Sequence, residues 1–593
     1  MRSAILTAAM LAAGFELGCS PLRQPLGSVA PATLLGTGAS SGSSGTSGAN
    51  GSTGSSGATG TAGGPTTGTL TGNQIPPLKP EWSACDPMAF RCFQDPGLSP
   101  SSPVSGQFSG TSNPDPTAKP VIIYPLAGSV HPINLADITF QWRRGPAAAQ
   151  TLFRIRLQRA DGDVFEFFVP CHASTMGAST TTQCVYAMPP GAWIDAATTA
   201  RGEAVTVDIA GVDPTHPGVV ATSDPMTISF SPRDVTGGLY YWSSSITGTE
   251  RLLFGARAAD AFITPKSASN PATCGGCHAV SGDGSTIAFD QGDTGTAVLR
   301  IASTADADTP LFTPATMHDS GTPALNHDGT RVLVAFSGRL LLRDAHTGKQ
   351  LFEVNETQLG ITQHAFHPEW SPDDATIAVT LSAEGDSDWA VRTGAIATLP
   401  YNGGQFGPVQ ILVPTGAEFN FYPTWSPDGR YIAFATAPVG AATQMPPVTS
   451  YDQPNARLRL VEVATKTVTE LANATWKAAS TSTWPKFAPT AQGDLMFLTF
   501  NSKIDYGFFL PNNAASVAQP QLWMTAIDAS KVGQAGVDPS APPVWLPFQD
   551  VTKRNYLGAW TENVGCRVEA DRSIGCGLDE ICSNGACAMV AAP

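Results

Sequence analysis

The sequence has few charged side chains, and fewer of those are basic than acidic. Only 14% of its 593 residues are charged, and 48 acidic against 33 basic side chains give a formal net charge of -15. So acidic a chain repels phosphate backbones, which argues against nucleic acid as a partner. Beyond the N-terminus, no apolar run reaches the roughly 20 residues that a membrane-spanning helix needs. The H-E-x-x-H and G-x-x-x-x-G-K patterns are also missing, and the G-x-S-x-G match at residues 38–42 lies in a Gly/Ser-rich run and not at a strand-to-helix elbow. No common hydrolase or nucleotide-binding motif is therefore recognisable.

The N-terminus has the pattern of an export signal. Arg2 supplies the positive start, and the apolar run over residues 4–15 has the length of a signal-peptide core. The run ends in L-G-C at Cys19, which resembles the bacterial lipoprotein signal, although Glu16 departs from it. We therefore expect residues 1–19 to be a lipoprotein-type signal and Cys19 to be lipidated. The alternative is that Cys19 is an ordinary cysteine and that another peptidase cuts nearby.

A long segment poor in apolar residues follows the signal. Residues 37–72 are almost entirely Gly, Ser, Thr and Ala, and such a sequence cannot bury enough apolar surface to offset its chain entropy. We expect residues 20–119 to be a disordered tether and connector. A lipid-anchored body on a Gly/Ser leash predicts a location in the bacterial cell envelope, at the outer membrane or the cell surface, with a periplasm-facing position as an option.

The cysteines other than Cys19 fall into close local groups. In an exported protein such groups indicate disulfides, which predicts the pairs Cys85 with Cys92 and Cys171 with Cys184. Residues 564–593 form a short tail that is too small for a core, so we expect two disulfides to hold it. The pairing there stays open, and a zinc site of four thiolates is the alternative. The tail cysteines are Cys566, Cys576, Cys582 and Cys587.

Apolar and polar residues alternate between residues 120 and 233. The run 138–142 reads I-T-F-Q-W, and the run 153–158 reads F-R-I-R-L-Q. Period-two runs separated by turn residues predict a β-sandwich with one face of each strand buried. The two runs resemble those of a fibronectin type III or immunoglobulin-like domain. His172 has no neighbours that would complete a metal site, so we expect it at the surface.

An internal repeat occupies residues 234–563. The copy at 422–434 reads Y-P-T-W-S-P-D-G-R-Y-I-A-F, and the copy at 367–379 reads H-P-E-W-S-P-D-D-A-T-I-A-V. In each copy an apolar strand leads into an Asp-rich turn suited to a tight hairpin, and a second apolar strand returns. A further hairpin follows, so each unit has four strands, as a propeller blade has. Weaker copies begin near Cys274, Thr322 and Trp484.

The repeat resembles the WD40-like repeat of TolB-type six-bladed β-propellers. Five copies and a partial unit at 239–254 make six blades if the late strand at 556–561 completes the early unit. This closure would remove the exposed sheet edges. The expected fold class is therefore all-β, with a β-sandwich at 120–233, a six-bladed propeller at 234–563 and the Cys-rich tail.

One copy begins with the motif C-G-G-C-H, from Cys274 to His278. C-x-x-C-H is the attachment pattern of a c-type haem. In that chemistry Cys274 and Cys277 add to the haem vinyl groups, and His278 coordinates the iron from one side. We expect all three side chains on one short turn, and haem c as the cofactor. The alternative is a structural disulfide between the two cysteines.

Alignment of the copies places this motif on the propeller. Cys277 matches His367, and His278 matches the proline that follows it, just before a blade's opening strand. Equivalent positions in a propeller form a ring around its axis, so the motif should lie at the rim of the central channel. Candidates for a second iron ligand are His318, His367 and His364, with an open coordination position as another possibility. His327 lies in an Asp-Gly turn, where we expect a surface side chain.

Two functions remain open from the sequence. The first is electron transfer or haem-based redox chemistry by an exported propeller protein, with an envelope protein or redox partner. The second is a non-enzymatic binding propeller whose ligand is an envelope protein or a glycan. A fold by itself does not decide between them.

Overall fold

The computed structural model describes the body of the chain and two short hairpins of the tail. The described residues are 80–86, 88–98, 104–145, 150–173, 182–213, 215–216, 218–264, 275–291, 298–312, 321–336, 339–354, 360–383, 390–440, 449–451, 453–476, 481–510, 519–564, 567–569, 572–574, 580–583 and 586–589. The predicted signal, Cys19 and the Gly/Ser segment lie outside them. Within the described residues no helix is long and apolar enough to span a bilayer.

The first part of the body is a sandwich of two sheets. A three-stranded sheet has the order β3 (Val121–Tyr124), β5 (Thr139–Arg143), β8 (Gln183–Ala187). The opposite sheet is built on β7 (Val164–Pro170), β6 (Leu152–Gln158), β9 (Ala204–Val212) and β10 (Val219–Thr222), with β11 (Met226–Phe230) also paired to β9 and β4 (Val130–His131) paired to β11. The alternation predicted for residues 153–158 is confirmed, since Phe153, Ile155 and Leu157 are fully buried.

The predicted connector is wrong where it reaches the sandwich. β1 (Arg91–Gln94) pairs in parallel with β7, and β2 (Thr111–Ser112) pairs in parallel with β10. The short 3-10 helices η1 (Val104–Phe108) and η2 (Pro116–Ala118) lie in the same stretch. Buried Phe93 and Phe108 anchor this segment, so a sequence without period still packs because it adds strands to existing sheet edges.

Both disulfides predicted for this part are confirmed. Cys85 bonds to Cys92, and Cys171 bonds to Cys184. His172 is exposed, as expected, and its ring stacks on Tyr186 at 5.9 Å. The sequence did not predict helix α1 (Pro190–Thr199), whose buried face includes Trp193.

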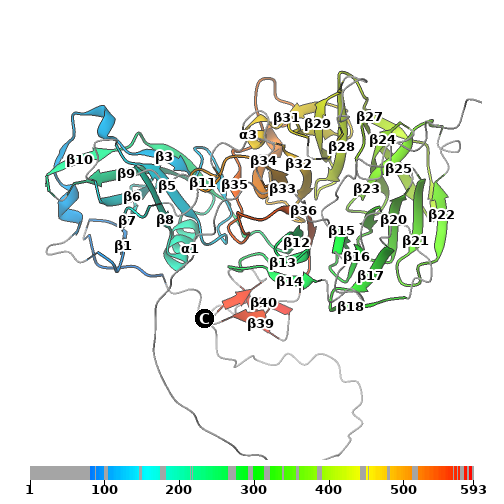
Figure 1. Cartoon of the computed structure of the whole chain (residues 1–593), viewed down its shortest axis with the longest axis horizontal. Coiled ribbons are helices and arrows are strands. Elements are labelled where there is room, and N and C mark those ends of the chain that lie inside the picture. Colours follow the sequence, from blue (N-terminus) through cyan, green and yellow to red (C-terminus); the bar gives the residue numbers. More distant parts are fainter. Residues whose placement is uncertain are drawn as a thin grey trace, which may run out of the picture. The chain divides into compact units, whose positions relative to one another are not determined.

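The second part is a propeller of six sheets, which confirms the predicted fold class (Figure 1). The first three blades are β12 (Gly238–Ser243), β13 (Gly248–Leu253), β14 (Asp260–Ile263) with β36 (Asn555–Thr561); β15 (Gly275–Val280), β16 (Thr286–Gln291), β17 (Val298–Ser303), β18 (Asp306–Pro310); and β19 (Thr322–Leu325), β20 (Arg331–Phe336), β21 (Arg339–Asp344), β22 (Gln350–Val354).

The other three blades complete the ring. They are β23 (His364–Trp370), β24 (Thr376–Ser382), β25 (Ala395–Asn402) with β26 (Gln405–Phe406) and β27 (Gln410–Val413); β28 (Glu418–Trp425), β29 (Tyr431–Pro438), β30 (Arg457–Glu462), β31 (Val468–Glu470); and β32 (Thr483–Phe487), β33 (Leu495–Ser502), β34 (Gln521–Asp528), β35 (Val544–Trp545). The short helices α3 (Ala472–Thr475) and η3 (Ala529–Lys531) lie between strands. Figure 1 shows β15, β23, β28, β32 and β36 nearest the axis.

The ring closes between its two ends, as the sequence predicted. β36 pairs antiparallel with β12, so that Thr561 lies opposite Gly238 and Asn555 opposite Ser243. Blade one therefore contains strands from both ends of the propeller segment. Every sheet of the propeller then has a neighbouring blade on each side.

The repeated turn owes its form to one side chain per blade. Ser371 donates to Asp373 at 2.6 Å and accepts the backbone N–H of Thr376 at 2.9 Å. Ser281 makes the same two contacts in blade two, and Asn326 does so in blade three. The turn aspartates thus accept hydrogen bonds within their own hairpins, which explains the S-P-D-G pattern without an ion.

The sandwich and blade six share contacts. The Tyr124 hydroxyl accepts the backbone N–H of Trp545 at 3.0 Å, and the side chain of Gln141 accepts the N–H of Phe508 at 2.7 Å. Tyr506 stacks on Trp545 with ring centroids 4.2 Å apart. One continuous apolar core contains buried residues of both parts.

The tail forms two small hairpins. β37 (Arg567–Glu569) pairs with β38 (Arg572–Ile574), and β39 (Glu580–Ser583) pairs with β40 (Ala586–Met589). The backbone register places Cys582 opposite Cys587. Cys566 and Cys576 lie outside the described residues, so the disulfides of the tail stay a prediction.

Candidate functional site

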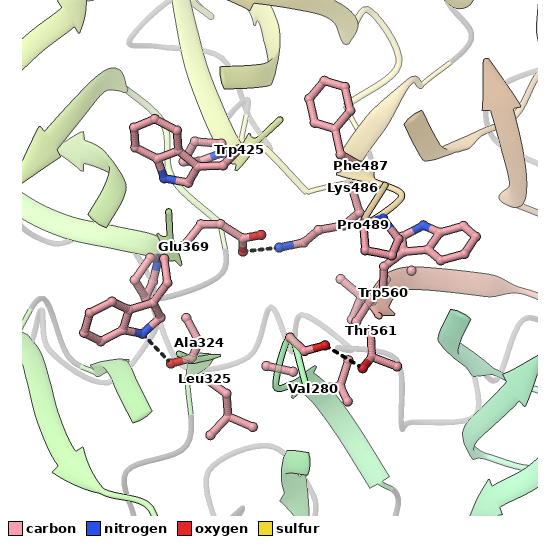
Figure 2. Close-up of a pocket in the computed structure, with 18 of the residues that line it drawn as sticks. Val280, Ala324, Leu325, Glu369, Trp425, Lys486, Phe487, Pro489, Trp560 and Thr561 are labelled. Atoms are coloured by element: carbon pink, nitrogen blue, oxygen red, sulfur yellow. Dashed lines mark hydrogen bonds and ion pairs between the residues drawn. The ribbon is translucent and has the colours of Figure 1, made fainter. Parts of the chain in front are cut away.

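A cavity of about 210 Å³ lies on the propeller axis, and all six blades contribute to its wall. Each blade supplies its axial strand: β36, β15, β19, β23, β28 and β32. Figure 2 shows side chains from these strands pointing into the cavity from opposite sides. The axial strand is the inner edge of its sheet, so its free side faces the channel.

Several axial strands carry a bulge at the same repeat position. The strand register shifts between Phe366 and Glu369 in blade four, and equivalent shifts occur in blades five and six. The bulged residues His367, Tyr422 and Trp484 have φ values of 50°, 54° and 51°. A bulge with left-handed backbone turns a side chain out of the strand's alternation. Leu557 repeats this conformation on β36, with φ 58°.

The bulged side chains of three blades pack against one another. The rings of Tyr422 and Trp484 are 3.5 Å apart and nearly parallel, and the His367 ring lies 4.3 Å from Tyr422. All three line the cavity. The imidazole of His367 is held by a hydrogen bond between its Nδ1 and the hydroxyl of Thr380 at 3.1 Å.

Blade two has Cys277 at the bulge position. The register of β15 shifts between Gly275 and His278, so this part of the motif is a bulged strand and the expected short turn is wrong for it. Cys277 carries a free thiol and lines the cavity. Burial, and next the carboxylate of Asp290, raise the pKa of the Cys277 thiol to about 12, so the thiol stays protonated at neutral pH.

His278 follows directly and also lines the cavity. The residue is 92% buried, and both ring nitrogens are shielded from solvent. The backbone of Tyr240 and that of Gly276 lie close enough to the ring to act on it as hydrogen-bond partners. Burial lowers the pKa of His278 from 6.5 to about 4, although backbone groups of Tyr240 and Gly276 act in the opposite direction. The charge of Lys486 lowers the pKa of His278 further. The ring is therefore neutral at pH 7.

These properties suit a cofactor whose metal is ligated by a neutral imidazole, as haem iron is. His278 and Cys277 are on the same wall in the order that C-x-x-C-H chemistry needs, and the thiol of Cys277 is not consumed by a disulfide. Cys274 lies outside the described residues. The cavity volume of about 210 Å³ is below the 300–1,000 Å³ that is usual for drug-sized ligands.

The other histidines predicted near the motif have different places. His367 lines the same cavity. His364 is half-buried at the start of β23, with its ring 6.4 Å from Phe366, and is not among the described residues that line the cavity. His318 lies outside the described residues. The side chain of His327 is 41% exposed, as expected for a surface residue, and its Nε2 lies 3.3 Å from a carboxylate oxygen of Glu562. It also lines the cavity.

The sequence analysis missed an ion pair inside the cavity. Glu369 of β23 and Lys486 of β32 extend toward each other across the channel and form a salt bridge (Figure 2). The hydroxyl of Thr424 donates to Glu369 at 3.3 Å. Each charged residue lies two positions after a bulged residue. Alignment of the repeats could therefore have indicated that both side chains face the channel.

The comparisons with known proteins bear on the fold alone. No protein-family model matches the chain, and no curated protein matches it. Among solved structures, TolB from Acinetobacter baumannii is similar, with 15% identity and a TM-score of 0.35, over 60% of this chain and 79% of that one.

Two further solved structures that match this chain are of proteins other than TolB. A nidogen/laminin complex matches with 15% identity and a TM-score of 0.33, over 55% of this chain and 97% of that chain. An oligogalacturonate lyase in complex with manganese matches with 11% identity and a TM-score of 0.28, over 70% of this chain and 84% of that chain. Similarity this low carries no functional argument, and the propeller is established here by the strand pairing.

Proposed function

We propose that this protein is an exported propeller that carries one c-type haem and transfers electrons. Cys274 and Cys277 would hold the haem covalently, and His278 would ligate its iron. The observation that carries the proposal is His278, a buried neutral imidazole next to a free thiol on the channel wall. When bound, the haem would supply one-electron redox chemistry.

The protein's own residues would have defined roles at such a site. Burial keeps His278 unprotonated over the physiological pH range, as ligation requires. His367 is the candidate for a second ligand, because it lines the same cavity and Thr380 fixes its Nδ1. The high pKa of the Cys277 thiol makes it a weak nucleophile in the folded protein. Attachment is therefore expected before blade two closes.

The test is expression of the full chain in a bacterium with a cytochrome c maturation system. We expect a haem-stained band that survives denaturation and disappears in Cys277→Ala. His278→Ala should alter the visible spectrum, whereas His346→Ala, which changes an exposed histidine, should not. A colourless protein with a disulfide between Cys274 and Cys277 would refute the haem proposal and favour the binding-propeller alternative.

The envelope location belongs to the same proposal. Lipidation at Cys19 would tether the body, and the partner would be a redox protein of the envelope. Fatty-acid labelling of the wild-type chain, lost in Cys19→Ala, tests the anchor. The sandwich is proposed to be of the fibronectin type III class, since a three-stranded sheet faces one in which β7, β6, β9 and β11 are successive neighbours.

A further inference from the structure

We propose that the channel also binds a small zwitterion of the α-amino acid class between Glu369 and Lys486. The ligand's carboxylate would meet the ammonium of Lys486, and its ammonium would meet the carboxylate of Glu369. This site concerns ligand binding and does not depend on the haem proposal.

The two charged groups reach into the cavity from the blades on either side of blade five. Glu369 comes from blade four and Lys486 from blade six, and Figure 2 shows both side chains reaching into the middle of the cavity. Their side chains keep 24% and 27% exposure, so each contacts the cavity besides its partner. Thr424, from blade five between them, fixes one carboxylate oxygen of Glu369. The second carboxylate oxygen contacts Lys486.

The other half of the channel carries short apolar side chains at the level of the ion pair. At the repeat position of Glu369 and Lys486, the remaining blades carry Thr424 and three alanines. The alanines line the side away from the ion pair: Ala279, Ala324 and Ala559. Short side chains leave room beside the charges, and Trp370 and Trp425 contribute aromatic walls. A cavity with apolar walls and a few convergent polar groups is the usual form of a small-molecule site.

Charge balance selects the class of ligand. A molecule that enters between the two residues separates their ion pair. A lone anion would satisfy Lys486 and leave Glu369 with only the hydroxyl of Thr424, and a lone cation would leave Lys486 unpaired. An unpaired charge in a desolvated site is costly. A zwitterion pairs both, so it is preferred over either singly charged analogue.

Cavity size limits the ligand further. A volume of about 210 Å³ is below the range for drug-sized molecules, which favours a single amino acid over a peptide. The alanine-lined side suits an aliphatic side chain. L-Leucine is therefore the probe, with two matched analogues: isocaproate, which lacks the amino group, and isoamylamine, which lacks the carboxylate.

The experiment is calorimetric titration of the full chain with the three compounds. We expect L-leucine to bind at least about tenfold more tightly than either analogue, because each analogue leaves one charge unpaired. Glu369→Gln combined with Lys486→Met removes both charges without leaving either alone, and should abolish the preference for leucine. Glu353→Gln, on strand β22 and outside the cavity lining, should retain it. The thermal unfolding midpoint of each variant shows that it is folded.

Two results would overturn the proposal. One is leucine binding no tighter than binding of isocaproate or isoamylamine, and the other is an unchanged preference in the double variant. Protein from hosts with and without cytochrome maturation is titrated in parallel. Covalent haem is scored on denaturing gels of the same samples, so failure of the haem proposal and failure of the ligand proposal are read separately.

Discussion

Protonation of His131 should destabilise the protein below neutral pH. This imidazole is fully buried in the sandwich, with ring centroids of Trp193 and Phe230 at 5.8 and 6.4 Å. Its Nε2 lies 2.9 Å from the hydroxyl of Ser129. Burial lowers the pKa of His131 from 6.5 to about 3. The native state therefore holds a neutral ring at a pH where the unfolded chain is already protonated.

The sign and size of the effect follow from proton binding. Between pH 6.5 and about 3 the unfolded state binds more protons than the native state at His131, so the free energy of unfolding falls as the pH falls. At about pH 4.5 the loss spans about two pH units, or about 2.7 kcal/mol at about 1.36 kcal/mol per unit.

Glu166 changes the pH dependence of the free energy of unfolding in the opposite direction. Burial, as the largest cause, raises the pKa of Glu166 from 4.5 to about 7. Its native carboxyl takes up a proton before the unfolded one does, so its contribution to stability grows as the pH falls through this window. The raw pH profile combines both groups, and only a difference between variants isolates His131.

The assay compares urea unfolding of wild type and His131→Gln at pH 7 and at about pH 4.5. The glutamine keeps a polar partner for Ser129 but does not titrate. On acidification the wild type should lose about 2.7 kcal/mol more than His131→Gln. The exposed control His172→Gln should follow the wild type. Equal losses in wild type and His131→Gln would refute the reasoning.

Three further predictions concern the propeller. Ser426→Ala removes the acceptor for the N–H of the returning strand and should lower the free energy of unfolding by about 1–3 kcal/mol in urea titrations. Gly284→Ala should lower the thermal midpoint, since a Cβ there would lie 1.9 Å from the carbonyl oxygen of Asn563 and φ is +75°. Trp560→Phe removes a 2.9 Å hydrogen bond to Thr499, and a double-mutant cycle with Thr499→Val should give a coupling of about 1 kcal/mol.

Much of the fold could be predicted from the sequence because its determinants are local. An Asp-Gly turn with a serine two residues before the aspartate specifies one hairpin, as Ser426 shows. Counting the copies of this hairpin along the chain then predicts the number of blades. Ring closure could also be predicted, since the strand at 556–561 had the repeat's opening pattern without the rest of a blade. Helix α1 was missed because its residues carry only a weak apolar periodicity.

The candidate site could be predicted only in part. Repeat alignment brought Cys277, His278 and His367 to one channel because all blades place equivalent positions around one axis. The salt bridge of Glu369 with Lys486 joins residues 117 apart in sequence. The two side chains meet in the channel although blade five lies between their blades. A linear alignment of the repeats does not represent such a contact.

The bulged strand position can carry reactive side chains without an added loop. In blades four and five a proline follows the bulged residue, Pro368 after His367 and Pro423 after Tyr422. Proline is tolerated there because the axial strand is a sheet edge, whose outer N–H groups lack partners in any case. In blade two, His278 takes the proline's place. The register of β15 also shifts here, although Cys277 is not among the described residues with a left-handed backbone. The strand position that carries packed rings in blades four to six thus supplies a thiol and an imidazole to the channel wall of blade two.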